Sequence, residues 1–512
     1  MTIILSTRRL LPVLVLLLHA YTGICSVFFN VKEFGAIGDG KNLDSKAINA
    51  AIETAVESGG GTVYLPAGNY LSGSIRLKSN ISLYIDQGAI IIAAPVNADN
   101  CYDEEEKSTN TIYQDHGHSH WKNSLIWGIN LSNVSIVGAG CINGKNLYKF
   151  WYSKSQQNAN KSISLLGCRN VIIRDLSILH GGWFAILATG VDNLTIDNLK
   201  IDTNRDGIDI DCCKNVHISK CNVNSPYDDG ICLKSSYALG YVRDTENVTI
   251  SDCMVSGFDE GTFLDGTYLR TKNPMYGNHP TGRIKFGTES TGGFKKITIT
   301  NCIFEYCRGL ALESVDGGFL EDVTISNIVM RDIVNDPIFL RLGRRMRGPS
   351  GMKPGTLRRI NLNNIIVYNA DPYYSCTLAG IPGYPVEDIH LSNIQIYFKG
   401  GDDEAKLSKT TPENENQYPE PGMFGKSPAY GLFVRHAKGI TISDVRINLL
   451  QSDSRPGCYF EDVTGLKLHN SSIQSSLDST SIVLKNVSNF CILQCESMLD
   501  QKFDFIENIE LK

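Results

Sequence analysis

One short phrase recurs along most of the chain: a polar residue, usually Asn, followed by an apolar, a polar and an apolar residue. Its occurrences include Asn170-Val-Ile-Ile, Asn193-Leu-Thr-Ile and Asn215-Val-His-Ile, which are separated by 23 and 22 residues. Short alternating strands at such a period indicate a solenoid of parallel strands around one interior. A β-sandwich also has many short strands, but it does not repeat one phrase at one position. The sequence therefore predicts an all-β fold, a right-handed parallel β-helix.

The stretch from Asp44 to Val56 breaks this pattern. Its apolar residues recur at i, i+1, i+4, i+5, i+8 and i+9, which is typical of an amphipathic helix, here capped by Asp44 or Ser45. Such a helix would cover the open end of the coil stack, where strand edges are otherwise unpaired. The stretch 399–428 is polar and proline-rich, so it is interpreted as a long loop and not as a domain boundary. No convincing linker divides the rest of the chain. We expect residues 26–512 to form a single β-helix domain.

The first 25 residues resemble an export signal. Arg8 and Arg9 precede a short apolar run at 10–18, and small residues follow near Cys25. The run is too short for a comfortable membrane span. We therefore predict a signal peptide at 1–25 and a secreted or periplasmic monomer with no membrane span. The formal net charge of −6, without any basic run, argues against nucleic acid as a partner.

Three of the 15 cysteines, Cys221, Cys253 and Cys302, end the same local phrase. Recurrence at one repeat position favours small buried residues stacked in the core. Disulfides remain an alternative, because removal of Cys25 leaves an even number of cysteines in an exported chain. The spacing of these cysteines is not that of a zinc site. We expect neither a metal ion nor a cofactor.

Two acidic phrases, 204–211 and 225–234, stand where a solenoid requires no acids. Asp206 and Asp228 are 22 residues apart, so we expect them on adjacent coils about 4.8 Å apart, with Asp229 beside them. Crowded carboxylates repel one another, which raises the pKa of at least one of them. One protonated acid beside ionised ones is what glycoside cleavage needs. A solvated acidic face or a calcium site would produce the same pattern.

Together with the N-terminal segments 34–40 and 59–70, these phrases resemble glycoside hydrolase family 28, the polygalacturonases and their relatives. Asn204-Arg-Asp206-Gly is similar to the family's Asn-Thr-Asp-Gly motif with one residue changed, and Asp228-Asp229 matches its Asp-Asp motif. The resemblance implies a pectic polysaccharide or oligogalacturonide as substrate. It also implies that Asp228 is the general acid, that Asp206 and Asp229 hold and activate a water, and that hydrolysis inverts the anomeric carbon.

The chain departs from the family in two places. It lacks the Gly-His-Gly tripeptide, and Arg283-Ile-Lys285 spells the carboxylate-binding Arg-Ile-Lys motif one coil early. The usual coil for that motif then corresponds to 309–313. We expect the substrate's carboxylate to have moved, which favours a branched, rhamnose-containing or oligomeric galacturonide over long plain polygalacturonate. The candidate substrate-binding residues are Arg283, Lys285, Lys234, Asp209, Glu313 and Arg308, although the cations among them could merely offset the acidic cluster.

Two other functions compete with the hydrolase. A calcium-dependent pectate lyase would use the acids as metal ligands, and a non-catalytic carbohydrate-binding β-helix would leave both acidic phrases without a role. The segment 258–280, which includes Tyr268 and Tyr276, interrupts the repeat. We expect it to form a wall of the cleft and to bias cleavage toward chain ends.

Overall fold

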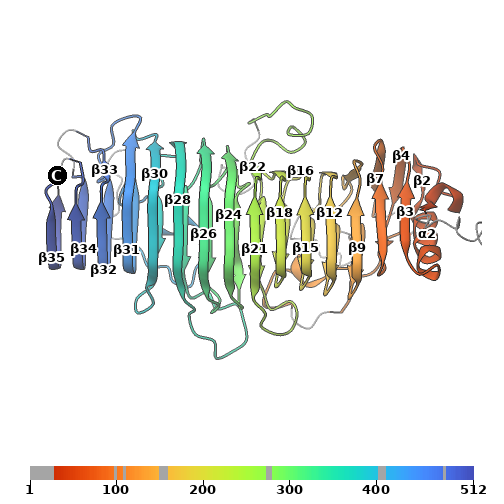
Figure 1. The fold of residues 1–512 in the computed structure, drawn as a ribbon, viewed down its shortest axis with the longest axis horizontal. Coiled ribbons are helices and arrows are strands. Elements are labelled where there is room, and N and C mark those ends of the chain that lie inside the picture. Colours follow the sequence, from red (N-terminus) through yellow and green to blue (C-terminus); the bar gives the residue numbers. More distant parts are fainter. Residues whose placement is uncertain are drawn as a thin grey trace, which may run out of the picture.

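The structure is a computed structural model that describes residues 28–96, 101–107, 111–148, 160–271, 280–401, 411–476, 480–496 and 498–511. The predicted signal peptide at 1–25 lies outside these residues. The described strands form one continuous stack of coils (Figure 1), and they pair in parallel register except for the last strand. The first coils contain β1 Phe28–Asn30, β2 Asp39–Leu43, β3 Gly61–Leu65, β4 Gly68–Ser72, β5 Ile75–Arg76, β6 Ile81–Ile85, β7 Ala89–Ala93, β8 Ile126–Ile129, β9 Ser132–Val137 and β10 Cys141–Asn143.

The middle coils each contain three short strands, one on each face of the helix. They are β11 Lys161–Leu166, β12 Arg169–Arg174, β13 Ser177–Leu179, β14 Phe184–Thr189, β15 Asp192–Asp197, β16 Lys200–Asp202, β17 Asp206–Asp211, β18 Lys214–Ser219, β19 Asn222–Asn224, β20 Ile231–Ser235, β21 Thr245–Ser251, β22 Met254–Ser256 and β23 Ile284–Ser290.

From β24 onward, two of the three faces merge into one long strand. The strands are β24 Phe294–Glu305, β25 Leu310–Ser314, β26 Leu320–Arg331, β27 Ile338–Leu342, β28 Leu357–Ala370, β29 Cys376–Ala379, β30 Val386–Phe398, β31 Leu432–Leu449, β32 Cys458–His469, β33 Ser472–Ile473, β34 Ile482–Leu493 and β35 Gln501–Leu511. Because β35 pairs antiparallel with β34, the C-terminal end of the stack finishes in a hairpin-like edge.

The recurring phrase builds the coil as predicted. In β12, Val171 and Ile173 are fully buried while Ile172 between them is 41% exposed, so alternate residues face the shared interior. The leading asparagines adopt the left-handed conformation, with φ of 55° at Asn170 and 54° at Asn193. The Nδ2 of Asn193 donates to Oδ1 of Asn170 at 2.9 Å, and the same bond joins successive coils into a ladder. These asparagines are therefore structural.

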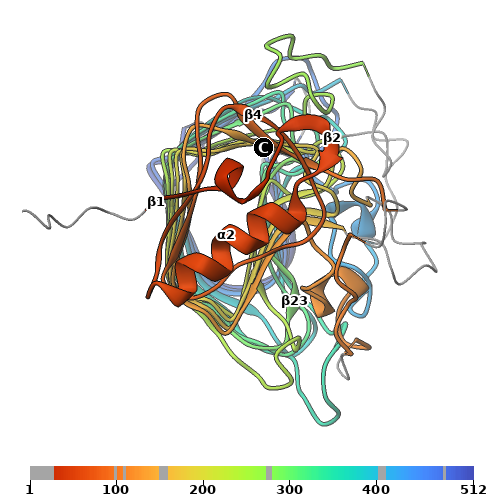
Figure 2. The same ribbon diagram turned by 90° about the vertical axis from the view of Figure 1, so that its right-hand side faces the viewer.

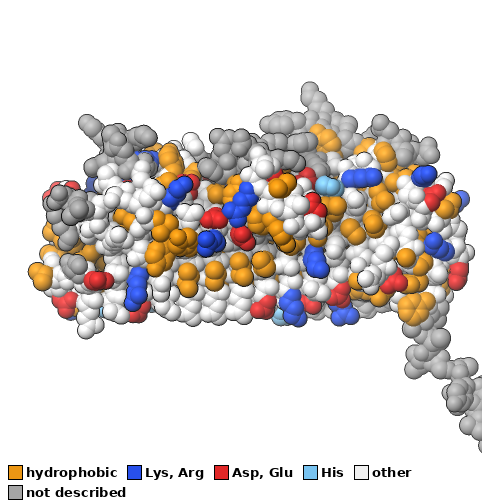
Figure 3. All heavy atoms as spheres, turned by 90° about the horizontal axis from the view of Figure 1, so that it is seen from above, with side chains coloured by type: hydrophobic (Ala, Val, Ile, Leu, Met, Phe, Trp, Pro, Cys, Tyr) orange, Lys and Arg blue, Asp and Glu red, His pale blue; other side chains and the backbone are white. Residues whose placement is uncertain are grey.

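The repeating cysteines lie in the core, as expected from their position in the repeat. Cys221, Cys253 and Cys302 are buried on successive coils, and every cysteine of the described residues is a free thiol. Outward positions also form rows along the stack. Figure 3 shows rows of hydrophobic side chains on one face. Strand register also aligns Met254, Ile303, Val329 and Ile366 along the stack.

The predicted cap helix is present as α2 (Ser45–Glu57), which lies across the N-terminal end of the stack (Figure 2). It buries Ala47, Ile48, Ala51, Ile52 and Ala55 against the first coils. Asp44 is the N-cap residue, but its carboxylate accepts the backbone N–H groups of Ile37 and Gly38 instead of a helix amide. Neither α2 nor any other helix of the described residues is long and apolar enough to cross a membrane.

Two short 3-10 helices extend from loops over one face of the stack. The first, η3 (His116–Ser119), follows the early coils, and η5 (Pro421–Phe424) belongs to the long loop predicted at 399–428. Both lie on the same side as β23 (Figure 2). A third 3-10 helix, η2 (Val31–Phe34), belongs to the N-terminal cap. The loops with η3 and η5 turn one strand face into a covered site.

Candidate active site

Four consecutive coils present the predicted site residues on one face: β17, β20, β23 and β25. Their register pairs Ile208 with Ile231 and Ile231 with Ile284. The first offset is 23 residues, so Asp229 lies level with Asp206, one residue further on than the expected Asp228. Asp228 still reaches the cluster from the turn that precedes β20. Because inward isoleucines alternate with outward polar residues, the strands hold the acids on the outer face.

The three acidic side chains converge. Asp206, Asp228 and Asp229 each offer an oxygen within 4.8 Å of the others. Asp206 and Asp229 are buried, whereas the Asp228 side chain is 23% exposed. Inverting glycosidases usually hold their two carboxyl groups about 6.5–9.5 Å apart. The cluster is tighter than that range, so its spacing does not support our expectation of inversion.

Protein cations pair with all three acids, and the contact of Asp206 is the longest, 3.8 Å from Nη2 of Arg205. The Nε of Arg205 donates to Asp228 at 3.2 Å, and the guanidinium lies 5.1 Å from the Trp183 ring centre. Asp229 accepts from the Nε of Arg283 at 2.8 Å and is 3.3 Å from the Nζ of Lys285. These contacts neutralise the cluster without a bound ion, which disfavours the alternative of a calcium site.

The same environment separates the pKa values of the acids. Burial raises the pKa of Asp206 well above its ordinary value, and the negative charge of Asp228 adds to the rise. Burial also acts to raise the pKa of Asp229, but Lys285 and Arg283 outweigh it and lower that pKa. The prediction that crowding raises at least one carboxyl pKa agrees with Asp206. Asp206 is therefore the acid that holds a proton most readily, and Asp229 is ionised.

The acids open into a cavity of about 490 Å³. Seven predicted site residues line it: Asp206, Asp228, Asp229, Lys234, Arg283, Lys285 and Arg308. It lies under the loops that carry η3 and η5, since His118, Tyr418 and Glu420 also belong to its lining. Seven of the nine predicted site residues therefore line one cavity.

Two predicted substrate-binding residues, Asp209 and Glu313, do not line the cavity, and this corrects our assignment. Both are fully buried. Asp209 is hydrogen-bonded to Nε2 of His118 at 3.0 Å, and Glu313 lies 3.6 Å behind Lys285. Burial raises the pKa of Glu313 to about 7. Alternation places both on the outer face, but loops and neighbouring side chains cover them, so they support the residues that line the cavity.

Several lining residues escaped the sequence analysis because they come from loops. His118 and Asp115 come from the η3 loop, and Tyr418 and Glu420 come from the long loop before η5. The Nζ of Lys285 donates to the Tyr418 hydroxyl at 3.0 Å. The only signal was the predicted length of the loop at 399–428, which does not say where its side chains point.

Comparisons with known proteins agree with the fold. Residues 28–170 match the family model described as rhamnogalacturonase A/epimerase, pectate lyase-like, and residues 110–268 match that of the right-handed β-helix region. A probable polygalacturonase of Vitis vinifera is 23% identical over 399 residues, 71% of this chain and 73% of that protein. An exopolygalacturonase structure from Thermotoga maritima has a TM-score of 0.57 at 18% identity and covers 95% of both chains. A family 28 exopolygalacturonase from Yersinia enterocolitica has a TM-score of 0.57 at 19% identity, and covers 91% of this chain and 77% of that one.

The chain is similar to the polygalacturonases. The solved structures share its fold, and the match to the β-helix model confirms the predicted right-handed coil. Each lysine or arginine in the described lining has a carboxylate partner: Arg205 with Asp228, Lys234 with Glu289, Arg283 and Lys285 with Asp229, Arg308 with Glu420, and Arg347 with Asp115.

Glu420 pairs with two cations of the cavity. Its carboxylate accepts from Nη1 of Arg283 at 3.3 Å and lies 3.0 Å from Nη1 of Arg308. It thus occupies the place where two arginines could bind the carboxylate of a sugar. Arg341 donates to the Gly380 and Glu413 carbonyls and does not line the cavity.

The described part of the predicted cleft wall, residues 258–271, contributes no residue to the cavity lining. Tyr268 packs edge-on against Phe258 and Phe263, and none of the three lines the cavity. Tyr276 belongs to residues 272–279, which lie outside the described residues. The preference for chain ends stays a prediction.

Proposed function

We propose that this chain is an exported hydrolase that cleaves galacturonide linkages in pectin. The observation that carries the proposal is the convergence of Asp206, Asp228 and Asp229 in a cavity flanked by Arg283 and Lys285. The polygalacturonases among its relatives support the same reaction class. Export by the segment 1–25 and a single domain over 26–512 belong to the proposal.

The proposed chemistry divides two roles among three acids. Asp228 has the most exposed carboxyl group, so it delivers a proton to the glycosidic oxygen as the C–O bond breaks. The raised pKa of Asp206 keeps a proton in the cluster, next to Asp228. Asp229, ionised beside Arg283 and Lys285, orients a water and takes its proton as the water oxygen bonds to the anomeric carbon. The acid that gave the proton is restored from solvent.

The substrate that fits this cavity is a pectic chain whose sugar next to Arg283 and Arg308 carries no free charge. Glu420 already neutralises both arginines, so a free uronate there must displace it or repel it. A methyl-esterified galacturonate or a rhamnose avoids that cost. The family model over 28–170, described as rhamnogalacturonase A/epimerase, supports a rhamnose-containing pectin. Plain polygalacturonate is then the poorer substrate.

The test is reducing-end release from three substrates: plain polygalacturonate, methyl-esterified pectin and rhamnose-containing branched pectin. We expect activity on at least one of the last two above that on the first. Loss of that activity in Asp228→Asn, with circular dichroism unchanged, would support the catalytic assignment. Absence of reducing ends from all three substrates would favour the non-catalytic carbohydrate-binding alternative.

The calcium-dependent lyase is the alternative that the charges disfavour. A lyase produces unsaturated sugars and loses activity with a chelator. Because Arg205, Arg283 and Lys285 already neutralise the acids, we expect saturated products and full activity in excess chelator. Unsaturated products that disappear with the chelator would replace the hydrolase by the lyase.

A further inference from the structure

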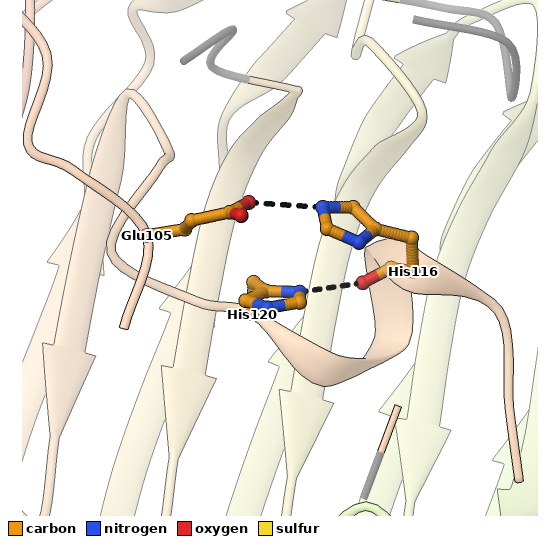
Figure 4. Close-up of side chains that lie close together, drawn as sticks. All are labelled: Glu105, His116 and His120. Carbon is orange, nitrogen blue, oxygen red and sulfur yellow. Dashed lines mark hydrogen bonds and ion pairs between the residues drawn. The ribbon is translucent and has the colours of Figure 1, made fainter. Parts of the chain in front are cut away.

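Three potential metal ligands lie together outside the catalytic cavity. Glu105, His116 and His120 each offer a ligand atom within 4.8 Å of the others (Figure 4). Glu105 comes from the segment 101–107, and the two histidines flank η3. None of the three lines the cavity. Neither the cysteine spacing nor the two acidic phrases indicates this cluster in the sequence.

The contacts of His120 select the imidazole tautomer that metal binding requires. Its Nδ1 lies 2.9 Å from the backbone carbonyl oxygen of His116. Since a carbonyl can only accept, Nδ1 carries the proton and Nε2 is left with its lone pair. The residue is 4% exposed, so packing fixes the ring as well. A ring N–H bonded to a backbone carbonyl is the usual support of a metal-bound histidine.

His116 and Glu105 complete the set. The Nε2 of His116 lies 2.9 Å from a carboxylate oxygen of Glu105, and its ring stacks on that of His120 at 4.1 Å (Figure 4). Two imidazoles and one carboxylate are ligands that Zn²⁺ prefers, with the remaining positions open to water. To bind the ion, His116 uses the lone pair of Nε2 and carries its ring proton on Nδ1, so the ion replaces the hydrogen between Nε2 and Glu105.

We propose that Glu105, His116 and His120 form a binding site for a divalent transition-metal ion, Zn²⁺ above all. The site has a structural consequence for the cavity. From the same loop, His118 contacts Asp209 at 3.0 Å and Asp115 pairs with Arg347 at 3.1 Å. An ion bound by Glu105, His116 and His120 therefore anchors the loop that places Asp115 and His118 in the cavity lining.

The test uses metal-free protein titrated with Zn²⁺ alone, and with Co²⁺ as a spectroscopic probe. We expect one Zn²⁺ per chain, visible Co²⁺ bands of nitrogen and oxygen coordination, and a Zn²⁺-dependent rise in Tm of at least about 2 °C. His116→Ala and His120→Ala should each weaken Zn²⁺ affinity by at least about 100-fold, since loss even of a supporting residue costs 10–100-fold. His116 is exposed, so its variant should fold normally.

Two control variants make the result decisive. His217→Ala removes an exposed histidine that bonds only Thr249 among the contacts described, so it should bind Zn²⁺ as the wild type does. Asp206→Asn removes one acid of the catalytic cluster and should also leave Zn²⁺ affinity unchanged. If Asp206→Asn abolishes binding and His120→Ala does not, the ion belongs to the catalytic cluster and the proposal is wrong. It is equally wrong if no variant changes binding, or if the wild type binds no Zn²⁺.

Discussion

Glu420 offers the sharpest test of how this cavity recognises charge. Its carboxylate contacts both Arg283 and Arg308, and it comes from a loop that is not part of the coil. In Glu420→Gln the side chain keeps its size but loses its charge, so both arginines become available to a substrate carboxylate. A hydrogen bond between charged groups contributes about 1.5–3 kcal/mol. That gain corresponds to about 10- to 150-fold in preference for a free uronate.

The assay compares kcat/KM on two matched pectic oligosaccharides, one with free carboxylates and one methyl-esterified. The sugars are the same, so their ratio reports only the charge. We expect Glu420→Gln to shift the ratio toward the free acid by at least about 10-fold, with Tm close to that of the wild type. Glu415→Gln is the control, because Glu415 lies in the same loop but pairs with Arg344 at 2.8 Å, outside the cavity lining.

An unchanged ratio would refute the reasoning, because Glu420 would then be only a counter-ion with no substrate carboxylate near it. An equal shift in Glu415→Gln would also refute it, since the effect would come from the loop's conformation. If Glu420→Gln loses all activity but stays folded, Glu420 itself holds the sugar, and the substrate proposal falls while the hydrolase proposal stands.

Three further predictions concern the acids. Asp206→Asn, Asp228→Asn and Asp229→Asn should each lower kcat at least about 100-fold with the fold retained, and near-normal turnover in all three would make the catalytic assignment wrong. We expect NMR of the first product to show an inverted anomer despite the close carboxyl spacing. Asp229 is paired with two cations and Asp206 is buried, so neither carboxylate is free to act as a nucleophile. A retained anomer would contradict this prediction. Because burial raises the pKa of Glu313 from 4.5 to about 7, the folded protein binds that proton more tightly, so its free energy of unfolding should fall between these pH values by on the order of 3 kcal/mol. Denaturant titrations should show a smaller fall in Glu313→Gln, and an equal fall would mean that Glu313 does not titrate in this range.

The sequence predicts well what the repeat determines. The alternation that buries Ile208 and Ile210 also places Asp206 on the outer face, and parallel register then brings Asp229 and Arg283 beside it. These are properties of period and pairing, so a single sequence contains them. The predicted register was wrong by one residue. The turn between β19 and β20 is one residue longer than the corresponding turn between β16 and β17, so the offset changes from 22 to 23 residues.

The sequence predicts poorly what covers the outer face. Asp209 and Glu313 obey the same alternation as Asp206, yet they are fully buried, because His118 and the neighbouring coils cover them. Alternation specifies whether a side chain points into or out of the coil, but not whether other parts of the protein cover it. The loops that supply His118 and Glu420 have no period, so neither residue could be placed from its spacing.

This difference suggests how such a fold can change its substrate. The coils hold Arg283 and Lys285 in fixed positions, since Ile284 between them is buried in the core and cannot shift without disturbing the stack. Residues 411–431, the described part of the loop that carries Glu420 and Tyr418, contain no strand, so their sequence can vary at lower cost. The cations on the strands therefore keep fixed positions, and the acids on the loop determine how much of their positive charge is neutralised before a substrate binds. A cavity of this kind changes its preference between charged and esterified sugars by altering one loop residue, without rebuilding the coil.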